Sequence, residues 1–65
     1  MFLKLTNSDG TKAYINMSKV YRITEQQYIV KETFAKQIGS NLETDKGGYN
    51  VRETPSQIFA MISAQ

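Results

Sequence analysis

A hexapeptide that almost recurs constrains this chain more than any other feature. Tyr28–Thr33 reads Tyr-Ile-Val-Lys-Glu-Thr and Tyr49–Thr54 reads Tyr-Asn-Val-Arg-Glu-Thr, but only the second copy runs into Pro55. The aromatic and β-branched residues of both copies favour strands. Because proline is well tolerated at the first position of a helix, the second copy predicts a strand that leads into a helix.

The end of the chain carries the clearest helix signal. Thr54, Pro55 and Gln57 supply an N-cap hydroxyl, a proline at the first helical position and a glutamine three residues after the cap, which together form a capping box. We therefore expect a helix over about residues 55–64. So short a helix is marginal alone in water and must dock on the sheet or on a neighbouring subunit. Its apolar stripe predicts the docking face: Ile58, Phe59, Met61 and Ile62.

The opening segment predicts a β-hairpin. Residues 2–6 and 11–17 alternate between apolar and polar side chains, and Asp9-Gly10 lies between them. This dipeptide is a strong hairpin signal because glycine accepts the positive φ that the turn requires. The alternation assigns six apolar side chains to the core face: Met1, Leu3, Leu5, Ala13, Ile15 and Met17.

Three more strands are predicted by runs of β-branched and aromatic residues. They span about residues 20–24, 28–33 and 49–53. The polar residues 25–27 separate the first two runs and indicate a turn. Residues 40–44 contain one apolar side chain, Leu42, which is typical of an edge strand, and residues 45–48 would close its hairpin.

Residues 28–38 leave two interpretations open. The strand pattern of the hexapeptide competes with Val30, Phe34 and Ile38, which fall at i, i+4 and i+8, the spacing of a helix. Residues 35–37 also suit a helix by propensity. With strand favoured here, the whole pattern predicts one α+β domain over residues 1–65: an antiparallel sheet of four to five strands followed by one C-terminal helix.

Size and composition exclude several devices that stabilise small proteins. A chain of 65 residues buries only about 60% of the surface of its unfolded state. It has no cysteine and no histidine, which removes disulfides, thiolate and imidazole chemistry and the usual zinc ligands. Self-association is the remaining common device, so we expect a homo-oligomer. No apolar run approaches the roughly 20 residues of a membrane helix and no signal peptide is present, which predicts a cytoplasmic protein without a membrane role.

No motif for catalysis or metal binding stands out. Glu32 and Glu53 occupy matching places in the two hexapeptides, but carboxylates flanked by basic residues are the ordinary solvated surface of a strand. Asp9, Glu43 and Asp45 lack the spacing of a calcium loop. We expect no enzymatic activity, no cofactor and no metal.

A candidate binding surface lies on the face that strand alternation leaves outside. It combines rings and cations: Phe2, Lys4, Lys12, Tyr14, Lys31 and Arg52. The formal net charge is only +2, with the excess in the N-terminal half. Exposed rings beside cations suit single-stranded nucleic acid, and they equally suit a subunit contact. Two functions follow: a non-enzymatic module that binds itself and another protein, which is the leading hypothesis, and alternatively a single-stranded nucleic-acid-binding module.

Scattered positions across the chain carry a family resemblance: Leu3-x-Leu5, Asp9-Gly10, Tyr14-Ile15-Asn16, Val20, Ile23, Tyr49-x-Val51-Arg52-Glu53-Thr54-Pro55 and Ile58. This pattern resembles the small FlbD-type flagellar proteins, also called swarming-motility proteins, and similar short proteins of phages and bacteria. The resemblance covers both ends of the chain, about half its length. It implies a short hairpin-rich sheet followed by one helix and a non-enzymatic role, with no catalytic or cofactor-binding residues to carry over.

Overall fold

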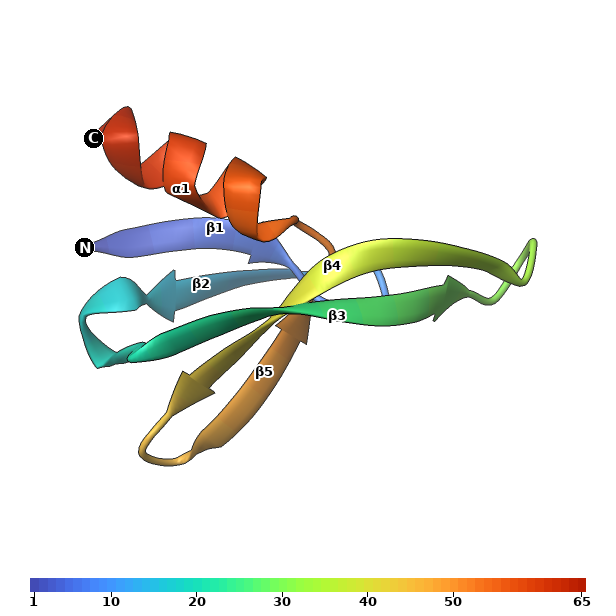
Figure 1. The fold of residues 1–65 in the computed structure, drawn as a ribbon, viewed down its shortest axis with the longest axis horizontal. Coiled ribbons are helices and arrows are strands. Elements are labelled where there is room, and N and C mark those ends of the chain that lie inside the picture. The colour runs from blue at the N-terminus through green and yellow to red at the C-terminus, as the bar shows by residue number, and fades with distance from the viewer.

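Five strands and one C-terminal helix form the protein, which confirms the α+β class (Figure 1). The computed structural model describes residues 1–65. The elements in chain order are β1 (Phe2–Thr6), β2 (Lys12–Asn16), a 3₁₀ turn η1 (Met17–Lys19), β3 (Arg22–Val30), β4 (Ala35–Thr44), β5 (Gly47–Val51) and α1 (Pro55–Ser63). The strands form two antiparallel sheets, one ordered β1-β2 and the other β3-β4-β5.

The opening hairpin forms as its alternation predicts. Leu3 lies across from Ile15 in the register, and both belong to the inner face. Gly10 has a φ of 93°, the left-handed conformation that glycine adopts without a steric cost. The return strand is shorter than expected, because the side chain of Asn16 accepts a hydrogen bond from the Ser18 amide and caps the 3₁₀ turn η1.

One long strand, β3, replaces the two strands expected at residues 20–24 and 28–33. The turn predicted at residues 25–27 is wrong, because Glu25, Gln26 and Gln27 pair in register with β4. They include no glycine or proline to break a strand, and their side chains are solvent-exposed, so their polarity carries no burial penalty. The helical interpretation of residues 28–38 is also wrong, since this segment is strand, turn and strand.

The segment expected to be an edge strand, residues 40–44, is the inner end of β4 and pairs with β3 on one side and β5 on the other. The prediction failed because it took polarity as a sign of exposure. Ser40 and Thr44 are buried, yet their hydroxyls donate to the carbonyls of Glu53 and Gly47 at 2.7 and 2.9 Å. Hydrogen-bonded hydroxyls are tolerated in a buried strand.

The helix α1 begins where the sequence predicts. The Gln57 amide donates to Thr54 Oγ1 at 3.1 Å, and the Thr54 amide donates to Gln57 Oε1 at 2.9 Å, so both halves of the capping box are made. Three of the four expected docking residues contact the core, with Ile58 fully buried and Met61 and Ile62 packed beside it. Phe59 is the exception and is 59% exposed. The helix α1, with nine residues, is too short to span a membrane, and the protein has no other α-helix.

A small core joins the two sheets and the helix. Its five buried hydrophobic residues come from four elements: Leu3 and Leu5 of β1, Leu42 of β4, Val51 of β5 and Ile58 of α1. The leucines of the opening hairpin therefore face inward, as predicted, and α1 covers them. Each such side chain contributes roughly 1.5–3 kcal/mol by leaving water. Five such side chains contribute little free energy compared with the conformational entropy that the chain loses on folding, so the core is small for this chain.

The β3–β4 hairpin continues beyond this core as a projecting arm. The arm comprises residues 26–30 of β3, the turn of residues 31–34 and residues 35–39 of β4, because β5 pairs with β4 only from Ser40 to Thr44. Figure 1 shows it extending away from the helix and the β1–β2 hairpin. Gly39 lies at its root, where a Cβ atom would lie 2.2 Å from the Val51 carbonyl oxygen, so only glycine admits this close approach.

The capping box generates a prediction about stability. Thr54→Ala removes the hydroxyl that accepts from the Gln57 amide, and we expect a loss of about 1 kcal/mol in the free energy of unfolding. Urea denaturation followed by circular dichroism measures it. Ser56→Ala is the matched control, since Ser56 is exposed and makes no side-chain hydrogen bond, and it should change stability little. Equal losses in the two variants would contradict the capping role.

Candidate functional site

The outer face of the β1–β2 hairpin assembles four of the six residues of the predicted binding surface. These four are exposed: Phe2, Lys4, Lys12 and Tyr14. Lys4 lies directly across from Tyr14 in the register, so a cation and a ring are neighbours on this face. Lys12 has a local partner, since its Nζ donates to Thr6 Oγ1 at 2.7 Å.

The other two residues, Lys31 and Arg52, lie beside a different hollow, so the predicted surface is not continuous. Arg52 donates from Nε and Nη2 to the Ser8 carbonyl at 3.2 and 2.9 Å, and its guanidinium carbon is 5.4 Å from the centroid of the Tyr28 ring. Lys31 and Arg52 each follow the end of a strand. Alternation along a strand therefore does not decide where their side chains point.

Glu53 is a structural residue and not the solvated surface carboxylate that the sequence suggested. Its Oε1 and Oε2 accept from the Thr6 amide at 2.9 and 3.1 Å, and Oε2 also accepts from Thr6 Oγ1 at 2.9 Å. The Arg52 amide donates to the Thr6 carbonyl at 2.7 Å. Glu53 thus joins the end of β1 to the segment that follows β5, while its counterpart Glu32 is exposed in the turn of the arm.

A hollow of about 370 Å³ lies between the β1–β2 hairpin and the β4–β5 hairpin. We call it the aromatic hollow, and nine residues line it: Phe2, Tyr14, Ile15, Asn16, Lys19, Thr44, Asp45, Lys46 and Tyr49. The sequence identified Phe2 and Tyr14 but not Tyr49 or the two lysines. Nothing in the local pattern brings residues 45–49 to this hairpin, since their position depends on how the two sheets meet.

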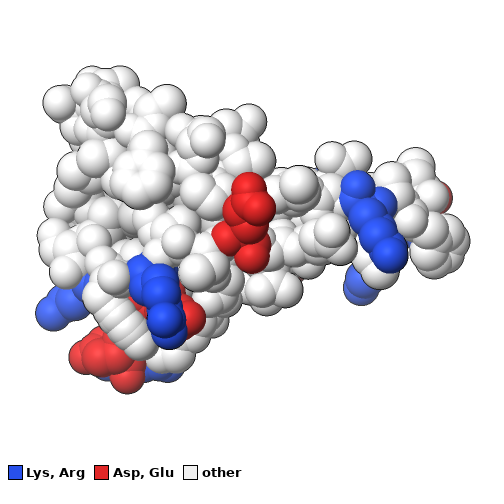
Figure 2. Space-filling model, viewed as in Figure 1, with Lys and Arg blue, Asp and Glu red and all other residues white.

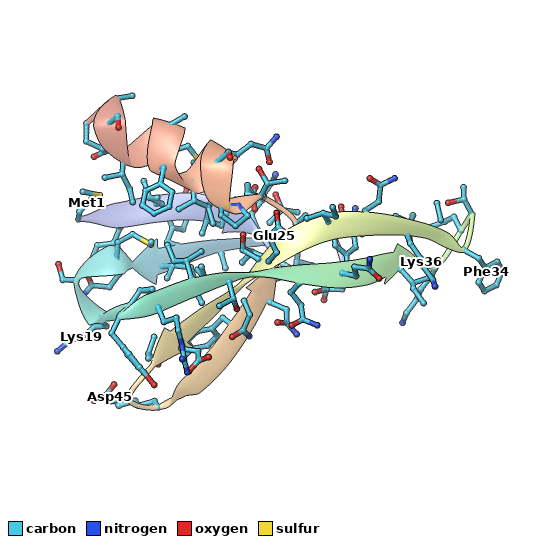
Figure 3. The ribbon with its side chains drawn as sticks, viewed as in Figure 1. Met1, Lys19, Glu25, Phe34, Lys36 and Asp45 are labelled. Atoms are coloured by element: carbon cyan, nitrogen blue, oxygen red, sulfur yellow. The ribbon has the colours of Figure 1, made fainter.

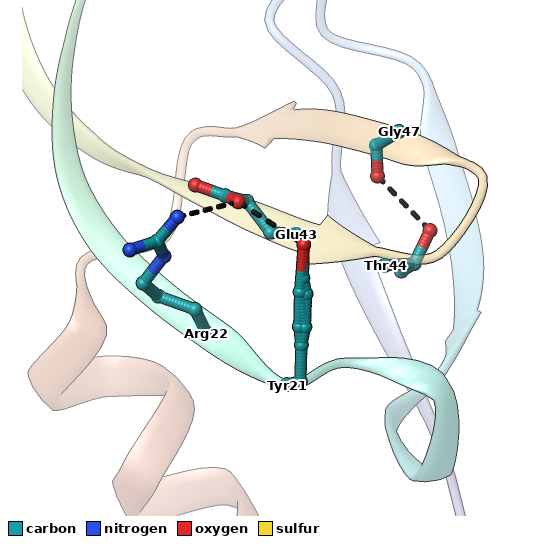
Figure 4. Close-up of polar contacts among 5 residues, drawn as sticks. All are labelled: Tyr21, Arg22, Glu43, Thr44 and Gly47. Atoms are coloured by element: carbon teal, nitrogen blue, oxygen red, sulfur yellow. Dashed lines mark hydrogen bonds and ion pairs between the residues drawn. The ribbon is translucent and has the colours of Figure 1, made fainter.

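The start of β3 carries the one ion pair of the protein (Figure 4). Arg22 Nη2 donates to Glu43 Oε2 at 2.9 Å, and the Tyr21 hydroxyl donates to the same oxygen at 3.4 Å. The hydrogen bond from Arg22 lowers the pKa of the Glu43 carboxyl below its ordinary 4.5. The same hydrogen bond raises the pKa of Arg22. The pair links strands β3 and β4 on the solvent side, and Arg22 and Tyr21 also line a mostly apolar hollow of about 280 Å³.

A second carboxylate, Asp9, has its pKa changed by hydrogen bonds within the turn of the opening hairpin. The Thr11 hydroxyl donates to Asp9 Oδ1 at 2.6 Å and the Thr11 amide donates to the same oxygen at 3.0 Å. These bonds lower the pKa of Asp9 and stabilise the turn of the opening hairpin. No group of three acidic side chains lies close enough together to hold a metal ion.

The ion pair generates a prediction about pH. Arg22→Ala removes the donor that lowers the Glu43 pKa, so this pKa should rise toward 4.5 in the variant. Because the pKa is depressed in the folded state, the pair stabilises the protein above the unfolded pKa and loses that effect as the pH falls through the folded pKa. NMR titration of the Glu43 side chain measures the shift. Lys36→Ala, which removes an unpaired cation, should leave it unchanged.

Comparison with known proteins adds no assignment to this geometry. Neither family models, nor curated proteins, nor solved structures give a match to the chain.

Proposed function

We propose that the protein is a non-enzymatic interaction module that associates with copies of itself through the arm of residues 26–39. One observation carries the proposal: the arm is a two-stranded ribbon with both edges open and apolar side chains exposed. The open edges can pair with another strand, and the exposed apolar side chains gain free energy when they are buried.

The open edges supply backbone groups for pairing. In the sheet order β3-β4-β5, strand β3 has no neighbour on its outer side, and residues 35–39 of β4 have none on theirs. Unpaired amides and carbonyls on a long strand are a template for another strand. Proteins that keep such edges single protect them with proline, lysine or bulges. Arm strands 26–30 and 35–39 contain no proline and one charged residue, Lys36.

The exposed apolar side chains supply the driving force. Phe34 at the tip is 81% exposed, and Ile29 is 56% exposed. In the register Ile29 lies across from Lys36 and Ile38 across from Gln27, which places both isoleucines on one face as diagonal neighbours. Figure 3 shows Phe34 and Lys36 at the end of the arm, far from the core. Ile38 is 49% exposed, so about half of each isoleucine side chain remains open to solvent.

The whole molecule also has more surface than its mass requires. It exposes 4590 Å², whereas a compact monomer of this mass exposes about 4,200 Å². The radius of gyration is 11.5 Å, against about 10.7 Å for a compact chain of this length. Nine large hydrophobic side chains are at least 45% exposed, and only five hydrophobic residues are buried. Association through the arm would bury apolar side chains in a part of the monomer that contributes none to the buried core.

Symmetry favours an isologous contact, because most homo-oligomers are closed by two-fold axes. Two β3 edges running antiparallel would then continue the arm as one ribbon of four strands, with the Ile29 faces side by side. The resemblance to FlbD-type proteins, which implies a non-enzymatic role, is in keeping with such a module. Binding of another protein to the remaining exposed apolar surface is part of the same proposal.

Replacement of Ile29 tests the arm. Ile29→Glu replaces an apolar side chain of the proposed contact with a charged one, and we expect an associating wild-type chain and a monomeric variant in sedimentation equilibrium at high micromolar concentration. Phe59→Glu is the matched control, because Phe59 is apolar, similarly exposed and located on α1, and it should leave association unchanged.

Hydrogen exchange locates the contact independently. If β3 edges pair, the backbone amides of residues 26–30 should exchange more slowly as protein concentration rises, while those of α1 should not change. A strictly monomeric wild type, or equal loss of association in both Glu variants, would overturn the assignment to the arm.

A further inference from the structure

The aromatic hollow combines rings and unpaired cations in one place. Phe2 of β1, Tyr14 of β2 and Tyr49 of β5 contribute three aromatic side chains, and Lys19 and Lys46 contribute two ammonium groups. Its volume of about 370 Å³ lies within the range of about 300–1,000 Å³ that is common for small-ligand sites. Self-association through the arm does not involve it.

The folded chain brings these residues together from distant parts of the sequence. Lys19 ends the 3₁₀ turn η1, and Lys46 lies in the turn between β4 and β5. Figure 3 shows Lys19 and Asp45 at one end of the molecule and Phe34 and Lys36 at the other. In Figure 2, charged side chains lie at these two ends and one acidic side chain lies between them, while the face over the helix is almost uncharged. The hollow and the arm are therefore separate surfaces.

Four polar groups of the hollow have no hydrogen-bond partner within the chain, namely two ammonium groups and two tyrosine hydroxyls. Neither the Nζ atoms of Lys19 and Lys46 nor the hydroxyls of Tyr14 and Tyr49 make a hydrogen bond, and neither lysine forms an ion pair. Asp45 is the single acid in the lining, which leaves the hollow with a net charge of +1. Two free ammonium groups beside exposed rings suit a ligand that carries both anionic groups and flat aromatic faces.

We propose that the aromatic hollow binds single-stranded nucleic acid, with bases stacked on the rings and phosphates held by Lys19 and Lys46. Stacking needs bases whose faces are free, which single strands offer and duplexes do not. Every base has such a face, so recognition would be tolerant of sequence. Tyr14, which is 69% exposed, is the ring most open to stacking. Asp45 would repel the backbone at one side and so direct it toward the lysines.

Paired charge variants test the role of the lysines. Fluorescence anisotropy with a labelled single strand of about ten nucleotides at low salt should show binding by the wild type. Lys19→Gln/Lys46→Gln should weaken binding and reduce the slope of log K against log salt by about 1.4, the value for two lost phosphate contacts. Lys31→Gln/Lys36→Gln removes the same charge from the arm and should change neither the affinity nor the salt slope.

Ring variants test stacking. Tyr14→Ala should weaken binding roughly 5- to 150-fold, the range for losing one stacked base, and Phe59→Ala, which removes an exposed ring on α1, should not. Both sites are exposed, and circular dichroism checks that each variant folds.

Two competing ligands distinguish a single-strand site from a duplex site and from a nucleotide site. A duplex of equal length should compete weakly, and so should a free mononucleotide, because it offers one phosphate and one base. A mononucleotide that competes as well as the oligonucleotide would overturn a nucleic-acid site in favour of a nucleotide site. Absence of binding at low salt, or equal losses in both lysine pairs, would overturn the proposal and leave the hollow as a protein contact.

Discussion

The junction between the end of β1 and the end of β5 holds this fold together. Asn7 and Val51 form an isolated bridge, the Arg52 amide donates to the Thr6 carbonyl, and the Glu53 carboxylate binds the Thr6 amide and hydroxyl. Because β1 belongs to one sheet and β5 to the other, these bonds are what join the two sheets along the backbone. The buried leucines of β1 and Leu42 of β4 belong to one core, which also contains Val51 of the junction.

The same junction separates the two surfaces that we propose for binding. It holds β5 against the β1–β2 side of the molecule, so β4 has no partner beyond Ser40 and the arm projects alone. It also brings Tyr49 and the β4–β5 turn beside the β1–β2 hairpin, which creates the aromatic hollow. One surface is apolar with open strand edges, and the other is aromatic and cationic. The thin core explains why a chain of this size would gain stability from a contact outside itself.

Predictions from short sequence patterns were correct where the structure of a segment depends mainly on its own residues. The capping box at Thr54 and Gln57 forms as expected, and the hairpin turn at Gly10 has the positive φ that its sequence predicts. The inward face of the opening hairpin was correct for Leu3, Leu5 and Ile15, because alternation in a half-buried strand has one stable orientation, but Met1 at the chain end is 49% exposed. Lys4 and Tyr14 accordingly lie outside.

Polarity misled the interpretation of the middle of the chain in two opposite ways. Residues 25–27 are polar because they lie on an exposed ribbon, not because they turn. Ser40 and Thr44 are polar although buried, because nearby carbonyls accept from their hydroxyls. The hexapeptide recurrence is not a structural repeat either, since one copy ends in the arm and the other in a helix cap. The identical Glu-Thr endings have different surroundings and therefore different roles.

The sequence by itself determined the strand and helix types at both ends, the inward face of the hairpin and the absence of thiol and imidazole chemistry. Those properties depend on spacing, turn chemistry and composition, which act within a few residues. Only the tertiary structure decided that β4 is an inner strand, that the arm is uncovered and that Tyr49, Lys19 and Lys46 meet Tyr14. Such proximity depends on long-range hydrogen bonds and burial across the junction of the two sheets, and no local pattern encodes it.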